Sequence, residues 1–255
     1  MESKKEHYKR TLLDLAKNEK LVPGIYNYCD RWCERCTKTQ HCLTYLHEQE
    51  MKEGSENLNP DEENKYFWEQ IRLAWEVTME LIEEDADRLG IDLSDVSDIE
   101  LPEHIEAPLE VKAKDYGTKM HDWLSANQPF IKEQAEKLVM INDEASIIKY
   151  QDALEVIQWY CFFIGAKVHR AHLDLDERQN DPEDEFNVYS DNLGSAKIAI
   201  IAVERSMDAL SVFYNDFKEK EDDILNFLVE LSALKKQLLQ TFPEVKEFKR
   251  PGFDD

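Results

Sequence analysis

Apolar side chains recur every three or four residues along most of the chain, which is the period of an amphipathic α-helix. Near the N-terminus this spacing covers residues 3–20, and Pro23 and Gly24 are expected to end that helix. A second helix is predicted over residues 61–89, because acidic side chains suit its first turn and Gly90 follows its last. Its three-four pattern consists of Trp68, Ile71, Trp75, Thr78 and Ile82.

The second half of the chain carries the most apolar segments. Further helices are predicted over residues 109–139, 143–173, 193–215 and 219–241. Those at 143–173 and 193–215 are apolar nearly all round, which is typical of helices at the centre of a bundle. Pro129 should kink or divide the first of the four, since proline cannot donate the helical hydrogen bond. Residues 91–108 and the acidic residues 174–192 show no sustained period and are predicted to be connections.

No sustained alternation of apolar and polar residues indicates a strand, so the chain is predicted to be all-α. The helices predict one antiparallel helical bundle over residues 60–245 with a small N-terminal four-cysteine metal-binding appendage. Residues 53–60 combine turn formers with polar side chains and are the best linker candidate. The predicted domains are therefore residues 1–59, with the first helix and the metal-binding segment, and residues 60–255, an acidic bundle.

Composition and charge narrow the classes of partner. The 255 residues carry a formal net charge of −24, and all of the excess negative charge lies in residues 60–255. Nucleic acids and anionic membranes are bound through clustered Lys and Arg, so we expect neither as a partner. The sequence shows no signal-peptide pattern and no run of about 18 apolar residues that would span a bilayer, so we expect a cytoplasmic protein.

The densest chemical signal is a run of four cysteines within fourteen residues: Cys29, Cys33, Cys36 and Cys42. In a reducing compartment clustered thiols usually bind metal, and the alternatives are reactive or disulfide-forming thiols and chance clustering. The first three would share one face of a helix, and a local turn would bring the fourth round to complete four sulfur ligands. We expect one metal centre here, either a zinc ion or a 4Fe–4S cluster.

The spacing Cys33-x2-Cys36-x5-Cys42 resembles the C-x2-C-x5-C portion of the SPASM auxiliary-cluster segments that follow radical S-adenosylmethionine enzymes, where these cysteines ligate a 4Fe–4S cluster. Cys29-x3-Cys33-x2-Cys36 is similar to the core signature of those enzymes. The resemblance covers fourteen residues, a span that also equals that of a small zinc knuckle. Their β/α pattern and glycine-rich S-adenosylmethionine motif are absent from the sequence. The resemblance therefore implies cluster ligation by these cysteines and no radical chemistry.

Polar residues in or beside the two apolar helices form a second candidate site: Glu155, Lys167, His169, Arg170 and His172 on the first helix, and Glu204 and Arg205 on the second. Charges next to unbroken apolar runs must pair or face a cavity. They predict either a polar pocket or a structural ion-pair network, and in the network Glu204 pairs with Arg170 or Lys167. A ferritin-like di-iron site is disfavoured, because it needs Glu-x-x-His on two helices and no histidine follows a glutamate at that spacing.

Three further patterns have simple interpretations. His169 and His172 have helical ligand spacing but lie near a predicted helix end, so they are expected to be a surface pair. Asp174, Asp176 and Glu185 fall on positions of an EF-hand register, yet the required glycine is absent and a solvated loop is predicted. Cys161 follows an apolar run and is predicted to be a core residue.

Two functions remain open from the sequence. The first is a binding or adaptor protein with a structural four-cysteine metal site and a protein partner, because no catalytic constellation is recognisable and four thiolates saturate a metal. The second is a redox or sensor protein carrying a 4Fe–4S cluster, whose potential Arg31, Trp32 and Arg35 would set. We favour the first. The oligomeric state and any enzymatic activity are left open.

Overall fold

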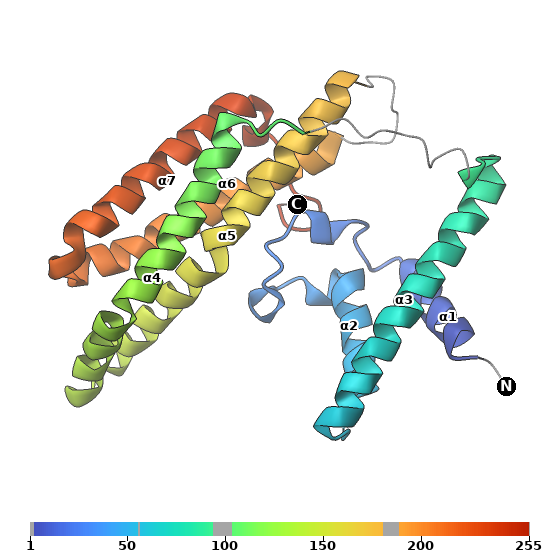
Figure 1. The fold of residues 1–255 in the computed structure, drawn as a ribbon, viewed down its shortest axis with the longest axis horizontal. Helices are drawn as coiled ribbons and strands as arrows, with labels where there is room; N and C mark the ends of the chain where they lie inside the picture. The colour runs from blue at the N-terminus through green and yellow to red at the C-terminus, as the bar shows by residue number, and fades with distance from the viewer. Residues whose placement is uncertain (1–2, 56, 94–103, 181–188, 255) are drawn as a thin grey trace. The chain divides into compact units, whose positions relative to one another are not determined.

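The computed structural model describes residues 3–55, 57–93, 104–180 and 189–254. These ranges contain seven α-helices and no strand, which confirms the all-α class. The helices are α1 (Lys4–Ala16), α2 (Leu43–Glu53), α3 (Pro60–Leu89), α4 (Pro108–Met140), α5 (Glu144–Asn180), α6 (Tyr189–Asp216) and α7 (Glu221–Thr241) (Figure 1). Within the described ranges, no helix has the length and apolar character needed to cross a membrane.

The chain folds as two compact units, and each is described by itself. The first contains Met1–Tyr26, Arg31–Glu103 and Pro251–Asp255, and the second contains Asn27–Asp30 and His104–Arg250. This division groups α3 with the N-terminal elements. It does not follow the boundary expected near residue 60, and the domains 1–59 and 60–255 stay a prediction.

In the first unit, α3 is delimited by strong local signals. The Asn59 side chain accepts the N–H groups of Asp61 and Glu62, both at 3.1 Å, and so caps the helix N-terminus. Pro60 takes the first helical position, where its missing N–H is not needed. Gly90 ends the helix with a φ of 70°, a conformation that glycine adopts without strain. The helix predicted over residues 61–89 is confirmed.

α3 packs against α1 in this unit. One face of α3 buries Leu73 and Val77. Beside it, Lys9 of α1 lies 2.7 Å from Glu80 and 2.6 Å from Glu84. The two helices are therefore joined by charged contacts.

The second unit is a bundle of α4, α5, α6 and α7 (Figure 1). α5 packs against α4 and α6, and α7 also packs against α4 and α6, so the four helices close a ring. Short connections at residues 141–143 and 217–220 reverse the chain, which makes α4 and α5, and likewise α6 and α7, antiparallel neighbours. The largest fully buried side chains of the core include Tyr116, Met120, Ile157, Tyr160, Ile164, Ile198, Leu210, Phe213, Phe217 and Ile224.

Some predicted boundaries differ from the structure. α1 ends at Ala16 instead of continuing to residue 20. α4 contains Pro129 and continues to Met140 without division. The acidic residues 174–192 are not one loop, since α5 extends to residue 180 and α6 begins at residue 189. The intervening residues 181–188, and residues 94–103 of the other predicted connection, lie outside the described residues.

Candidate metal centre

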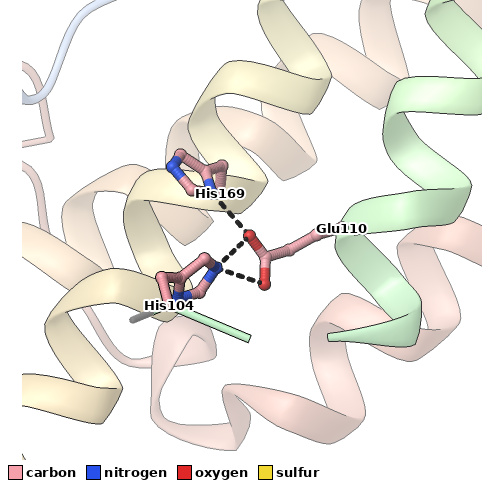
Figure 2. Close-up of side chains that lie close together, drawn as sticks. All are labelled: His104, Glu110 and His169. Carbon is pink, nitrogen blue, oxygen red and sulfur yellow. Dashed lines mark hydrogen bonds and ion pairs between the residues drawn. The ribbon is translucent and has the colours of Figure 1, made fainter. Parts of the chain in front are cut away.

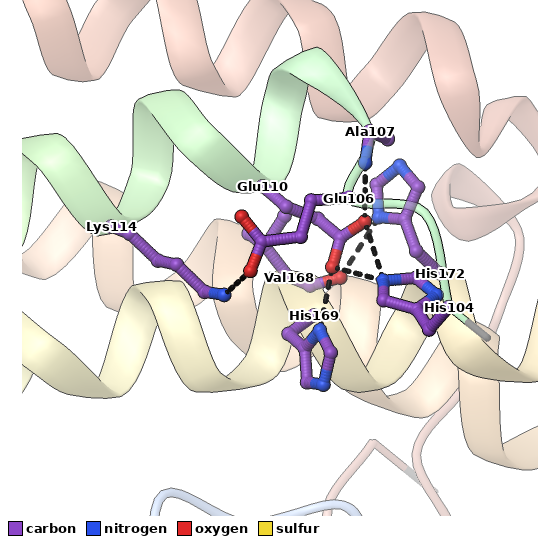
Figure 3. A network of polar contacts seen from close by, with 8 residues as sticks. All are labelled: His104, Glu106, Ala107, Glu110, Lys114, Val168, His169 and His172. Carbon is purple, nitrogen blue, oxygen red and sulfur yellow. Dashed lines mark hydrogen bonds and ion pairs between the residues drawn. The ribbon is translucent and has the colours of Figure 1, made fainter.

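Glu110 is positioned by the first turn of α4. Ala107 precedes the helix and Pro108 takes its first position. The Glu110 side chain turns back so that Oε1 accepts the Ala107 N–H at 2.8 Å (Figure 3). A carboxylate here is also favoured by the helix dipole. These local forces hold a fully buried carboxylate at the N-terminus of α4.

Two imidazoles meet this carboxylate (Figure 2). His104, in the segment before α4, places Nε2 3.1 Å from Oε1 and 2.9 Å from Oε2 of Glu110. His169 of α5 places Nδ1 2.6 Å from Oε2. The rings meet edge to face with centroids 4.9 Å apart. The side chain of His104 is 17% exposed and that of His169 is 35% exposed, so the group reaches solvent through its imidazoles.

The environment keeps Glu110 charged. Burial disfavours the carboxylate, but hydrogen bonds from the Ala107 N–H and from His169 and His104 outweigh that effect and hold the pKa of Glu110 below its usual value. The carboxylate is therefore ionised at neutral pH. Because a buried charge needs polar partners, the two imidazoles satisfy it either through hydrogen bonds or by sharing a metal ion with it.

The spacing of the three side chains suits a metal ion. The ligand atoms of His104, Glu110 and His169 all lie within 4.8 Å of one another, and no other group of three His, Cys, Asp or Glu side chains in the described part of the chain does so. Ligands about 2.1 Å from zinc or iron stand about 3 to 3.5 Å apart at neighbouring corners of the coordination shell. Small rotations of the imidazoles therefore admit an ion. Two imidazoles with one carboxylate is a known ligand set for zinc and for non-haem Fe(II).

His172 lies one turn beyond His169 on α5 (Figure 3). It is 8% exposed, its Nδ1 lies 2.9 Å from the carbonyl oxygen one turn earlier, and its ring meets Phe242 edge to face at 5.3 Å. The prediction of a surface pair is therefore wrong for His172. Its ring is buried against Phe242, while Glu106 and Lys114 form an ion pair near Glu110 (Figure 3).

The cysteine segment is not one helix. Residues Cys33–Arg35 and Thr39–His41 form short 3-10 turns, and Cys42 is the residue before α2. The predicted helix face shared by Cys29, Cys33 and Cys36 is therefore wrong. Three of the cysteines belong to the first unit and Cys29 belongs to the second. All four are partly buried, and their ligation of one metal centre stays a prediction.

Backbone contacts hold the segment with three cysteines within the first unit. The Val22 N–H donates to the His41 carbonyl at 3.0 Å, and His41 Nδ1 lies 2.8 Å from the Lys20 carbonyl. The Lys38 N–H donates to Cys36 Sγ at 3.3 Å, a contact that stabilises a thiolate. The segment is therefore fixed by its main chain, with the Cys36 sulfur already hydrogen-bonded.

In the second unit, the residue after Cys29 is anchored on the bundle. Asp30 Oδ2 accepts the Tyr160 hydroxyl at 2.5 Å and Arg205 Nη1 at 2.6 Å, and the Asp30 carbonyl accepts Trp159 Nε1 at 3.0 Å. Burial and the Asp30 carboxylate together raise the pKa of Tyr160. Arg205, predicted as part of a core polar group, thus binds Asp30.

Two other charged residues of that group have partners outside it. Glu204 is exposed and pairs with Lys235 of α7 at 2.7 Å, so its predicted pairing with Arg170 or Lys167 is wrong. Glu155 accepts a hydrogen bond from Gln151 at 2.9 Å. The apolar run around Glu204 concealed its orientation, because the α6 face toward α7 ends in solvent at this position.

Two predictions about single residues have mixed outcomes. Cys161 is 4% exposed and its thiol donates to the Gln158 carbonyl at 3.2 Å, which confirms a core role. The side chains of Asp174, Asp176 and Glu185 lie outside the described residues.

Sequence reasoning missed Glu110 and His104. The Glu-x-x-His pattern lies within one helix, whereas these three side chains come from a connecting segment, the first turn of α4 and the second half of α5. A local signal was present: Pro108 followed by Glu110 is typical of a helix start whose third residue bonds back to the cap.

Comparison with protein-family models, with curated proteins and with solved structures found no match.

Proposed function

We propose that this chain is a metal-binding helical protein whose bundle holds one divalent first-row transition metal on His104, Glu110 and His169. The observation that carries the proposal is the fully buried Glu110 carboxylate, with imidazole nitrogens at 2.6 Å and 2.9 Å from one of its oxygens. Nitrogen and carboxylate donors suit zinc and Fe(II). Three protein ligands also leave a coordination position for water or a small ligand.

The proposed role is metal-responsive binding, in keeping with the binding or adaptor class expected from the sequence. An ion at this place ties residue 104 to α4 and α5 at once, so metal occupancy stabilises one end of the bundle. A metal that binds only the folded chain at 100 times its Kd adds about 2.7 kcal/mol to the free energy of unfolding. That stabilisation is the expected signal of the proposed ion.

The test uses the full chain, stripped with a chelator under reducing conditions and titrated with Zn²⁺ and Co²⁺. We expect the midpoint of thermal unfolding to rise with metal, and the rise to be smaller in His104→Ala, Glu110→Gln and His169→Ala, which keep the cysteines. His121→Ala is the matched control, since His121 is an exposed histidine of α4 outside the group. Circular dichroism verifies that each variant is folded. Equal metal-induced shifts in all variants would show that the group is a structural hydrogen-bond network.

A second metal site is proposed at the cysteines, because the Lys38 N–H already bonds the Cys36 sulfur and the basic side chain of Arg35 lies 3.9 Å from the Trp32 ring centre. We propose that Cys29, Cys33, Cys36 and Cys42 bind one zinc ion or one 4Fe–4S cluster. This site and the imidazole group differ in ligand chemistry, and each can be measured alone.

Anaerobic purification with elemental analysis tests the cysteine site. About one zinc that is lost in Cys33→Ala/Cys36→Ala supports a structural site, and iron with acid-labile sulfide in a brown protein supports the redox alternative. With Co²⁺, sulfur-to-metal charge-transfer absorption reports the cysteines, whereas d–d bands without it report the imidazole group. A folded chain that retains neither metal nor cluster, and shows no charge-transfer band, contradicts the cysteine proposal.

A further inference from the structure

α3 has a second apolar face that lies open to solvent. It consists of Trp68, Ile71, Trp75, Met79 and Ile82, which we call the α3 stripe. Trp68 is 62% exposed and Trp75 is 69% exposed. Leu73 and Val77, which α3 buries, fall on the opposite side of the helix because they stand two residues from Trp75 in either direction.

An exposed apolar stripe of this kind is typical of a protein–protein interface. Five large side chains at three-four spacing form one continuous face over four helical turns, and exposed apolar patches of this extent on soluble proteins mark interaction sites. Tryptophans are enriched among the residues that dominate binding energy at protein interfaces. α3 thus has two apolar faces: the first unit buries the face with Leu73 and Val77 and leaves the α3 stripe exposed.

The spacing of the stripe is symmetric about Trp75. Ile71 and Met79 stand four residues from it on either side, and Trp68 and Ile82 stand seven residues from it. When two identical helices pack antiparallel around a two-fold axis at Trp75, the two copies of Trp75 meet, Ile71 faces Met79, and Trp68 faces Ile82. Each apolar residue then meets an apolar residue, as an isologous interface requires.

Charges along one edge of the stripe fit the same register. The edge carries Lys65, Arg72, Glu76 and Glu83, all exposed, and Arg72 lies 3.8 Å from Glu76 of its own helix. In the antiparallel pair, Lys65 comes beside Glu83 of the second copy and Arg72 beside Glu76 of the second copy. Opposite charges thus meet along the whole edge, and flanking pairs of this kind set partner choice and orientation between helices.

We propose that α3 pairs with α3 of a second copy of this chain in an antiparallel homodimer centred on Trp75. The order of apolar and charged residues along α3 is complementary to itself when the helix is reversed. A second copy of α3 therefore matches it at every position, which an unrelated helix does not. The proposal is independent of metal binding, since none of the proposed ligands lies on α3.

The test measures the mass of the full chain by sedimentation over a concentration series, with chelator and reductant present so that metal bridging and disulfides play no part. We expect a species of twice the chain mass of 30.0 kDa. Trp75→Glu should weaken association at least about 100-fold, because the axis places both introduced charges together. Circular dichroism confirms that this variant keeps its helices.

A charge-exchange experiment fixes the register. One chain carries Lys65→Glu and Arg72→Glu, and another carries Glu76→Lys and Glu83→Lys. Each alone should be monomeric, whereas an equimolar mixture should form the heterodimer. A control chain with Lys132→Glu and Lys137→Glu has the same net charge as the first and should still dimerise.

A wild-type chain that stays monomeric at every concentration overturns the proposal and shows that something else covers the stripe. Dimers that persist in Trp75→Glu, or mixtures of the two exchanged chains that fail to associate while the control dimerises, overturn the antiparallel register.

Discussion

Replacing Gly117 by alanine tests how closely α4 and α5 approach. A Cβ atom at this position would lie 2.5 Å from the carbonyl oxygen of Cys161 and 3.2 Å from Phe162 Cδ1. Ordinary van der Waals contact begins near 3.4 Å, so the two helices must separate locally by about 1 Å. A gap of that size removes about a quarter to a half of the dispersion attraction in the flanking contacts. Overpacking of this kind costs about 1 to 3 kcal/mol.

The gain from alanine opposes this loss. Alanine is more favourable than glycine in a helix interior by about 1 kcal/mol, so the net loss for Gly117→Ala should be about 0 to 2 kcal/mol. Gly165 provides the matched control on the same interface: its added Cβ would lie 3.5 Å from the Ala113 carbonyl oxygen, which is ordinary contact. Gly165→Ala should leave the free energy of unfolding unchanged or raise it by up to about 1 kcal/mol.

Urea unfolding of the chelator-treated chain, followed by circular dichroism at 222 nm, measures both variants. A lower midpoint for Gly117→Ala with an unchanged slope is expected, because the compactness of the unfolded chain is not altered. Equal midpoints for the two variants would refute the reasoning, since they would show that α4 and α5 do not touch at Gly117.

Two further predictions concern single contacts. Asp30→Ala should lower the free energy of unfolding by about 2 to 3 kcal/mol, because it removes the carboxylate that accepts the buried Tyr160 hydroxyl and Arg205. Urea unfolding measures this, and a loss below about 0.5 kcal/mol contradicts it. Glu80 is held by hydrogen bonds from Lys5 and then Lys9, which lower its pKa from 4.5 to about 2. Its contribution to stability is therefore present above pH 4.5 and is lost as the pH falls toward 2. The difference in free energy of unfolding between wild type and Glu80→Gln should shrink over this range. A difference independent of pH would show that the pairs do not form in solution.

Much of the secondary structure could be predicted because its signals are local. α3 begins and ends where Asn59, Pro60 and Gly90 dictate, and α7 follows its apolar spacing to Thr241. The length of α5 could not be predicted, since the acidic residues after 173 have no apolar partner that would reveal their helix. Periodicity also cannot tell which apolar face is covered, and the α3 stripe shows the consequence: its pattern resembled a core face, yet the structure buries the opposite side.

The candidate sites, too, could be predicted from the sequence only in part. The cysteines are close in sequence, so their clustering was visible, but their spacing implied a helix that the 3-10 turn at Cys33–Arg35 replaces. His169 was predicted as a member of the polar group on the apolar helices and as half of a pair with His172. Its partner Glu110 was missed, because it stands 59 residues away. What joins Glu110 to His169 is the antiparallel return of α5 along α4, and no residue spacing encodes that distance. The group follows from two features taken together. The proline-initiated first turn of α4 fixes a carboxylate at its third position, and the α4–α5 hairpin brings a histidine of the antiparallel helix beside that carboxylate.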